Sequence, residues 1–217
     1  MAGRQLPLDL GHRTAFEAAD FLEAPSNAQA LAWLARWPDW PGHASCLWGP
    51  PGCGKTHLAH LFAARCGGAV LPATAIESRP GGHLVVEDAD RGVDEVALFH
   101  LFNATREAGA FLLLTGRAPP SRWAIRLPDL ASRLNAIPAI AIQAPDDALM
   151  AAVLVKLFAD RQLEVGAGVI DWLVTRGERS FAAAGAVVAR LDAQALAERR
   201  NITLPFVRAV IPDREAG

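Results

Sequence analysis

The stretch Gly49–Thr56, GPPGCGKT, decides how the rest of this sequence is interpreted. It fits the pattern G-x-x-x-x-G-K-[ST], in which glycines let a loop wrap closely around phosphate so that backbone N–H groups face the phosphate oxygens. The pattern requires a strand before the loop and a helix after it. Both are predicted here, by the short apolar run at 44–48 and by a helical pattern that ends at Gly67. This context disfavours the alternative, a chance glycine-rich turn.

The predicted loop supplies both backbone and side-chain contacts for a nucleotide. The N-terminus of the following helix adds positive potential at the phosphates. Lys55 is expected to reach the β- and γ-phosphates, and the Thr56 hydroxyl is expected to ligate Mg²⁺. The predicted nucleotide-binding residues of this stretch are Gly49, Pro50, Pro51, Gly52, Cys53, Gly54, Lys55, Thr56 and His57.

Short apolar runs alternate with helical patterns as far as Pro145. This alternation predicts an α/β fold, in which a parallel sheet is covered by helices on both faces. An N-terminal helix is predicted after Ser26 or Asn27, with Trp37 on its apolar side, and the sequence PDWPG at 38–42 ends it. The other predicted elements are strands within 44–48, 69–73, 83–90, 110–116 and 138–145, and a helix over 94–109.

After Pro145 the pattern becomes purely helical. We predict four helices there and no strand, which places a domain boundary near 144–146. The chain is therefore expected to end in a small helical domain. The predicted helices span 146–162, 167–177, 180–199 and 204–211.

Two predicted strands end in polar residues that suit phosphate chemistry. Glu87 and Asp88 end the run LVVED, and carboxylates beside a phosphate loop can hold Mg²⁺ and orient the attacking water. Glu87 is assigned the metal side and Asp88 the water side. Thr115, at the end of FLLLTG, is expected to lie on the strand beside them and to touch the γ-phosphate or the water. Solvated acids and a threonine in a turn are the competing interpretations.

Composition excludes several classes of protein. The chain has 217 residues, 52% of them hydrophobic, a formal net charge of −2 and a pI of about 6.3, which argues against strong general attraction to nucleic acid. Its three cysteines show no metal-ligand spacing, so we expect neither a disulfide framework nor a zinc site. The sequence shows no signal peptide and no apolar run of about 18 residues, so a cytoplasmic protein without a membrane span is expected.

The order of these motifs resembles the AAA+ ATPase family, and within it the DnaA branch of bacterial replication initiators. The similarity is greatest to the Hda family of short DnaA-related regulators. It implies an AAA+ P-loop NTPase fold with three parts: an extended clamp-binding segment (1–12), an α/β nucleotide-binding domain (13–145) and a helical lid domain (146–217). The stretches that carry it are QLPLDL (5–10), GPPGCGKTHLA (49–59), LLLTGRAPP (112–120), LPDLASRLNAI (127–137) and ITLPFVRAV (202–210).

The resemblance also implies an activity. Hda-like proteins bind ADP or ATP with Mg²⁺, associate with the sliding clamp of the replicase and trigger hydrolysis of ATP bound to DnaA. Arg133 in LASRLNAI matches the arginine that AAA+ subunits insert into a neighbour's site. Its position alone would suggest only an exposed arginine near a helix end.

Three features depart from the family pattern. Glu87 stands where Asp is usual and Asp88 where Glu is usual, which implies slow intrinsic ATP hydrolysis. The arginine that DnaA-like lids direct to the nucleotide falls on Ala182, so Arg179, about one turn earlier, is the candidate substitute. Only IPDREAG follows the lid, with no helix-turn-helix domain, so we expect no direct sequence-specific DNA binding.

The N-terminal stretch QLPLDL has two interpretations from its residues alone. Pro7 biases the preceding residue towards extended backbone, where the three leucines share one face. Such a segment suits either an edge strand or a peptide that docks into another protein. The resemblance favours the sliding clamp as partner, with Gln5 as the polar anchor and Leu6, Leu8 and Leu10 as apolar contacts.

Alternative functions remain at this point. A stand-alone AAA+ ATPase, such as a helicase loader, would need efficient hydrolysis by this chain. A pure interaction module would bind nucleotide only for stability. A small-molecule kinase is disfavoured because no acceptor-site motif is present. The oligomeric state is left open, a homodimer included.

Overall fold

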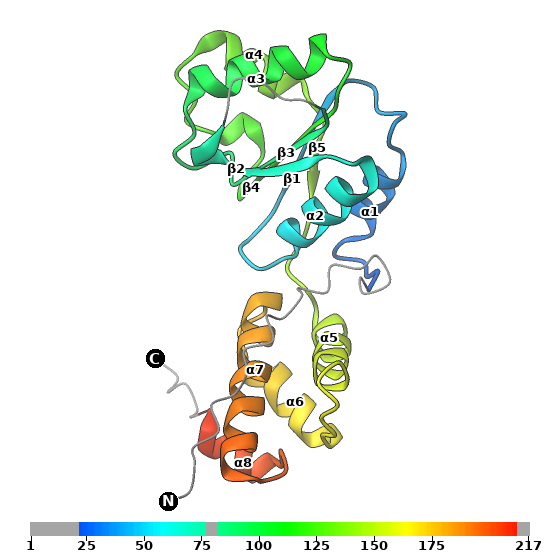
Figure 1. Ribbon diagram of the computed structural model, residues 1–217, viewed down its shortest axis with the longest axis vertical. Coiled ribbons are helices and arrows are strands. Elements are labelled where there is room, and N and C mark those ends of the chain that lie inside the picture. Colours follow the sequence, from blue (N-terminus) through cyan, green and yellow to red (C-terminus); the bar gives the residue numbers. More distant parts are fainter. Residues whose placement is uncertain (1–21, 77–81, 212–217) are drawn as a thin grey trace, which may run out of the picture.

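The computed structural model describes residues 22–76 and 82–211. One sheet of five parallel strands, in the order β2-β3-β4-β1-β5, lies at the centre of the part that precedes the helical lid (Figure 1). The predicted α/β class with a parallel sheet is confirmed, and each strand lies within a predicted apolar run. The strands are β1 (Ala44–Trp48), β2 (Ala69–Pro72), β3 (Leu84–Glu87), β4 (Leu112–Gly116) and β5 (Ala139–Ala141).

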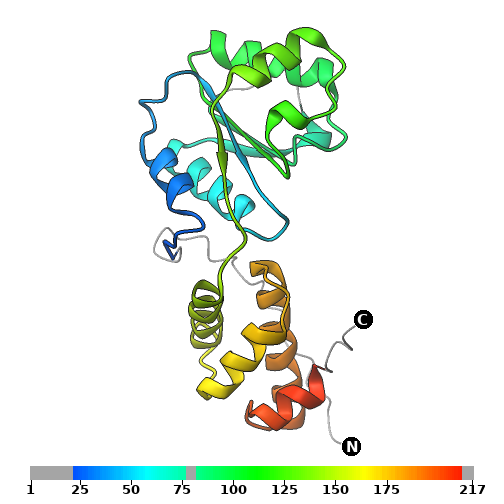
Figure 2. The ribbon, with the colours of Figure 1, turned by 180° about the vertical axis from the view of Figure 1, so that it is seen from behind.

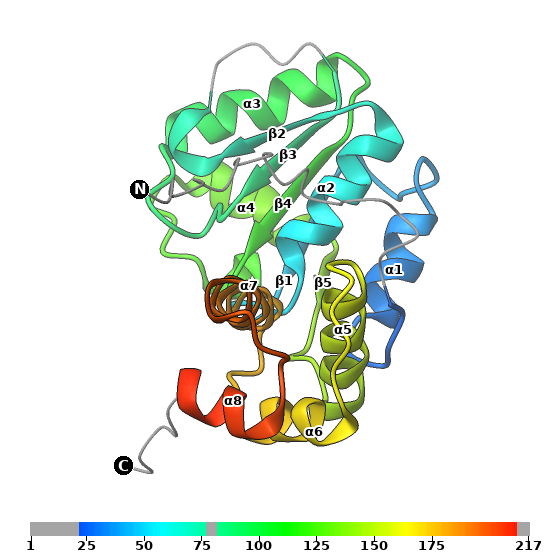
Figure 3. The same cartoon turned by 60° about the horizontal axis from the view of Figure 1, so that its bottom comes forward.

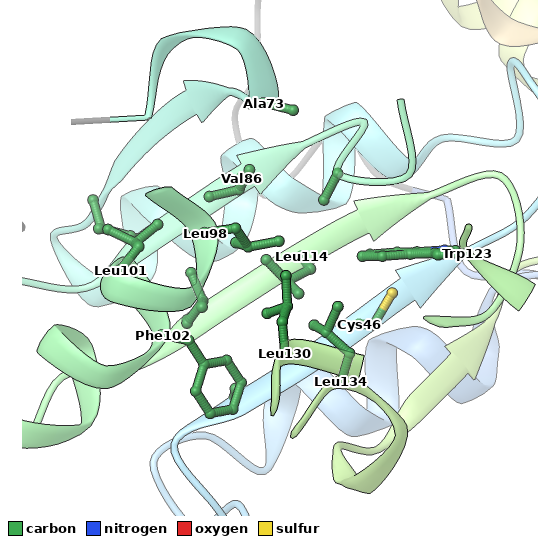
Figure 4. Close-up of a cluster of buried hydrophobic side chains, with 14 residues drawn as sticks. Cys46, Ala73, Val86, Leu98, Leu101, Phe102, Leu114, Trp123, Leu130 and Leu134 are labelled. Carbon is green, nitrogen blue, oxygen red and sulfur yellow. The ribbon is translucent and has the colours of Figure 1, made fainter. Parts of the chain in front are cut away.

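Helices cover both faces of the sheet, which explains why its central strands β1 and β4 are largely buried and mostly apolar. Helices α1 (Ala28–Ala35) and α2 (Lys55–Cys66) lie on one face, and α3 (Glu95–Glu107) and α4 (Pro128–Ala136) on the other (Figure 1). Successive strand residues alternate between the two cores. On the α3/α4 side, Cys46 and Leu114 pack against Leu98, Leu130 and Leu134 (Figure 4). The neighbouring strand residues Leu47, Val85 and Leu113 pack on the α1/α2 side.

Helix α1 is shorter than predicted, because Trp37 lies beyond its end at Ala35. Pro38 has no N–H to continue the helical hydrogen bonds, so the ladder stops there. The Arg65 guanidinium instead donates to the carbonyl oxygens of Leu34, Ala35 and Trp37 at 3.2–3.3 Å. Asn27 occupies the N-cap position, as predicted, but its side chain accepts from Ala24 N at 2.9 Å and caps no N–H of α1.

The lid region, defined as helices α5–α8, has a hydrophobic core of its own. The connection from β5 leads directly into it (Figure 2). All four predicted helices are present, and the largest difference is at the end of α5, which stops at Ala159. The helices are α5 (Asp147–Ala159), α6 (Ala167–Arg176), α7 (Phe181–Glu198) and α8 (Leu204–Val210), and two short 3₁₀ turns, Ala73–Ala75 and Pro120–Arg122, lie in the sheet domain. In the described ranges no helix combines the length and apolar character needed to cross a bilayer.

Candidate nucleotide site and the arginine of helix α4

The loop Gly49–Thr56 leaves β1 at the carboxyl edge of the sheet. Gly49 N donates to Gly116 O at 3.2 Å, and Ile142 N donates to Trp48 O at 2.7 Å, so β4 and the segment after β5 hold the start of the loop. A Cβ at Gly49 would lie 2.1 Å from Ile142 O. Because that carbonyl belongs to the backbone, only glycine fits where β1 turns into the loop.

The N-terminus of α2 is open to an anion. Its N-cap, Gly54, has φ 98° and no side chain to cap the helix, and Gly52 also has a positive φ of 73°. The first N–H groups of a helix have no partner within the helix, and they carry the positive end of its dipole. Both glycines are therefore required by conformation, and the loop geometry leaves N–H groups available for phosphate.

Lys55 is buried and folded onto its own loop. Its Nζ donates to Gly49 O at 2.8 Å and to Pro50 O at 2.9 Å. Cys53 Sγ lies 3.8 Å from the same Nζ. Burial raises the pKa of the Cys53 thiol, an effect that the Lys55 charge partly offsets. Within residues 22–76 and 82–211, no carboxylate pairs with the Lys55 ammonium, so a phosphate oxygen would have to compete only with two carbonyl oxygens for its N–H groups.

The polar residues that end β3 and β4 lie side by side, because these two strands are parallel neighbours in the sheet. Thr115 is 1% exposed, and its Oγ1 accepts from Asp88 N at 3.0 Å while its carbonyl oxygen accepts from Ala89 N at 2.8 Å. Asp88 is exposed and has φ 51°, a left-handed conformation that Asp tolerates better than most residues. Thr115 therefore fixes the turn that carries the Asp88 carboxylate, a role that sequence alone did not indicate.

The donor set at this edge fits a magnesium ion. Among the described residues, Glu87 Oε1 is buried and has no hydrogen-bond partner, and Thr56 is exposed at the start of α2. A buried carboxylate oxygen without a partner is costly, so a bound cation would relieve it. Carboxylate and hydroxyl oxygens beside a phosphate are ordinary Mg²⁺ partners.

Asp90 is a further residue of this edge that sequence reasoning missed. Its Oδ2 accepts from Arg117 N at 2.7 Å, which links the turn after β3 to the loop after β4. In the sequence EDAD (87–90), the third acidic residue was the only signal for this contact, but an acidic residue in a turn is usually solvated.

The lid region contacts the phosphate loop directly. Phe181 N, at the start of α7, donates to Gly52 O at 3.1 Å. Ser180, the N-cap of α7, is 3% exposed, and its Oγ accepts from Ala183 N at 3.1 Å. The N-terminal end of α7 lies beside the loop-bearing end of β1 (Figure 3). Ser180 was also missed, although a serine before an apolar run is a recognisable helix start.

Two family models and several known proteins match this arrangement. Residues 147–211 match the lid domain of Hda, and residues 45–108 match the ATPase family associated with various cellular activities (AAA). The phosphate-loop region is thus AAA-like, and the lid region is Hda-like. An uncharacterized protein of Haemophilus influenzae is 28% identical over 186 residues, covering 76% of this chain and 80% of that protein.

Solved structures with the same fold include replication initiators. Domain III of Thermotoga maritima DnaA superposes with a TM-score of 0.79 at 15% identity, covering 96% of this chain and 98% of that one. AMPPCP-bound DnaA from Aquifex aeolicus gives 0.69 at 15% identity, covering 82% and 65%. The RuvB Holliday junction motor of Thermotoga maritima gives 0.63 at 17% identity, covering 86% and 66%, so the fold extends beyond initiators.

The Hda-like lid brings no arginine to the loop at the expected position. Ala182 is exposed in the first turn of α7. Arg179 Nη2 binds Asp147 Oδ1 at 2.8 Å, within the lid itself. Gln5, Leu6, Leu8 and Leu10 lie outside the described residues.

Arg133 lies towards the edge of the sheet where the strands begin, and the chain's own phosphate loop lies at the edge where they end. Helix α4 ends at Ala136, just before β5 begins, whereas the loop follows the end of β1, and the two strands are parallel. Arg133 Cζ stacks 5.0 Å from the Phe99 ring centroid and 5.9 Å from that of Phe102. Its positive charge acts on His43, the residue just before β1. Burial lowers the pKa of the His43 imidazole, and the charges of Arg106 and Arg133 lower it further. Arg133 therefore belongs to the edge where the strands begin.

The replacement Gly52→Ala is expected to separate the Hda-like lid from the loop. The new Cβ would lie 2.1 Å from Ser180 Cβ, and the backbone would keep a positive φ. The left-handed conformation alone costs about 1–2 kcal/mol, so a thermal melt should fall by at least about 3 °C. The matched control is Gly185→Ala within α7, where a Cβ meets nothing within 4 Å and should raise stability. Equal melts for both variants would contradict the contact.

Proposed function

We propose that this Hda-like protein stimulates hydrolysis of ATP bound to DnaA by supplying Arg133 in trans, while it holds an adenine nucleotide and is tethered to the sliding clamp. The protein would thereby act as a negative regulator of replication initiation. Its own ATP turnover would be weak.

The position of Arg133 carries the proposal. The arginine lies towards the edge where the strands begin, and the phosphate loop lies at the edge where they end. Arg133 is thus out of place for this chain's own nucleotide and available to a neighbour's. Within the described residues it forms no ion pair, and its guanidinium rests on aromatic rings instead. Its charge is therefore not neutralised before a partner binds.

The chemistry suits a guanidinium. In phosphoryl transfer, negative charge spreads over the transferring group, and an arginine finger supplied by a second protein raises the rate by about 10³–10⁵. The planar donor fork also fixes the orientation of the phosphate oxygens. A slow ATPase such as nucleotide-loaded DnaA is the kind of partner that such an increase would switch.

The chain's own nucleotide has a structural part in this proposal. The loop N–H groups and Lys55 would bind its phosphates, and Thr56 with Glu87 would hold Mg²⁺, partly through water. Bound Mg²⁺ would neutralise phosphate charge. The exposed Asp88 carboxylate and the absence of an arginine at Ala182 favour slow turnover. A nucleotide between the loop and α7 would strengthen the contact of Phe181 with Gly52.

The experiment that tests the proposal measures hydrolysis of DnaA-bound ATP with and without clamp-loaded DNA. We expect stimulation that requires both this chain and the clamp. If the chain instead turns over ATP rapidly by itself and DNA accelerates that turnover, the helicase-loader interpretation replaces this one.

The double replacement Gln5→Ala with Leu6→Ala is expected to abolish clamp binding and leave the thermal melt unchanged. Gln5 is proposed as the polar anchor of an extended peptide, and Leu6 as its first apolar contact. Surface plasmon resonance on immobilised clamp measures the loss. A large fall in melting temperature would instead assign these residues to the protein's own core.

A further inference from the structure

Glu95, the first residue of α3, holds the start of α4 through its side chain. Its Oε1 accepts from Arg126 N at 3.1 Å, and its Oε2 accepts from Arg126 N at 2.9 Å and from Leu127 N at 2.7 Å. One carboxylate thus takes three hydrogen bonds from two successive backbone N–H groups. Hydrogen bonds to a charged acceptor are stronger than neutral ones.

Helix α4 has no cap of its own at this end. Its N-cap is Leu127, which has no polar side chain, and Pro128 follows at the first helical position. The N-terminus of a helix needs acceptors and favours negative charge. Glu95 supplies both from the neighbouring helix, immediately before the first turn of α4.

We infer that Glu95 is a positioning residue for Arg133, an inference that rests on the proposed function. Helix α4 has only 9 residues, so Arg133 lies less than two turns from the fixed start. The buried Leu130 and Leu134 set the rotation of the helix, and Glu95 sets its position along the axis. Helix α3 contacts the other end too, through the rings under Arg133. Helix α3 thus contacts α4 both at its start, through Glu95, and near its end, through the rings under Arg133.

Two variants of Glu95 test the role. Glu95→Gln keeps one acceptor oxygen and Glu95→Ala keeps none. Because a misplacement of about 1 Å can cost about 100-fold in rate, we expect the maximal stimulated hydrolysis of DnaA-bound ATP to fall roughly 10-fold in Glu95→Ala and less in Glu95→Gln. The DnaA concentration for half-maximal effect should not change, since Arg133 itself remains.

Asp94→Ala is the matched control. Asp94 is the N-cap of α3, and its Oδ1 accepts from Val96 N and Ala97 N at 2.9 and 3.0 Å. The control therefore removes hydrogen bonds next to Glu95 that stabilise α3 and do not touch α4. It should lower the melting temperature without lowering the maximal stimulated rate. Equal losses of rate in Asp94→Ala and Glu95→Ala would overturn the inference.

Amide hydrogen exchange on the full-length chain gives a readout that does not depend on DnaA. Glu95→Ala should accelerate exchange across 126–134 by about 10-fold or more, and Asp94→Ala should accelerate it only at the start of α3. Unchanged exchange at 126–134 would overturn the inference. In the same hydrolysis assay, full stimulation by Arg133→Ala would refute the proposed function, whereas full stimulation by Glu95→Ala with none by Arg133→Ala would refute only the role of Glu95.

Discussion

Replacing Arg133 with alanine is expected to lower the stimulated hydrolysis of DnaA-bound ATP by about 10³-fold or more, down to the unstimulated rate. The reason is electrostatic, because no other described group of α4 offers a guanidinium to a partner's phosphates. Folding should be retained, since Arg133 is only partly buried and its contacts are with ring faces, worth about 0.5–1 kcal/mol at such a site. The measurement is a single-turnover assay of DnaA-bound ATP with clamp-loaded DNA.

Two further variants make that result specific. Arg106→Ala removes an exposed arginine from the last turn of α3, whose charge acts on the same His43, and should leave stimulation unchanged. Arg133→Lys keeps the charge and loses the planar fork, so it should restore little activity. Clamp binding by Arg133→Ala should equal that of the parent chain. Full stimulation by Arg133→Ala would remove the basis of the proposed mechanism.

Replacing Lys55 with alanine is expected to weaken adenine nucleotide binding by roughly 10- to 100-fold. The ammonium is buried at the loop and already donates to Gly49 O and Pro50 O, so it is pre-positioned for phosphate oxygens. A hydrogen bond that involves a charged group contributes about 1.5–3 kcal/mol, which corresponds to that loss. Calorimetric titration with MgADP measures the change.

The sequence offers a direct control for this variant in Lys156, its other lysine. Lys156 forms an i,i+4 ion pair with Asp160 at 3.2 Å on the surface of α5, so Lys156→Ala should not alter nucleotide affinity. Unchanged affinity in Lys55→Ala would mean that the nucleotide is not held by this loop. A destabilised Lys55→Ala chain that still stimulates DnaA at low temperature would favour an interaction module with a structural nucleotide.

Local patterns predicted the elements of the sheet well and the ends of helices less well. The run ASCLW marks β1 without error, because a strand covered on both faces is mostly apolar. Its one polar side chain, Ser45, is buried and accepts a hydrogen bond from Trp33 Nε1 at 2.7 Å. The end of α1 was misjudged, since Trp37 has the right spacing for the helix and only Pro38 with Arg65 shows where the helix stops. Asp90 and Glu95 were missed because the backbone N–H groups that their carboxylates bind lie 27 or more residues away in the sequence. Ser180 was missed because its approach to Gly52 arises only in the folded chain.

The sequence by itself determined the phosphate loop and the fold class, because both depend on residue types at short spacings. Arg133 and the N-terminal segment were assigned through the resemblance to the Hda family, and their roles stay predictions. The tertiary structure decided what depends on distant segments meeting. It brought Thr115 to the backbone of Asp88, and α7 to Gly52. It also set Arg133 towards the sheet edge opposite the loop, because parallel strands send every strand start to one edge and every strand end to the other.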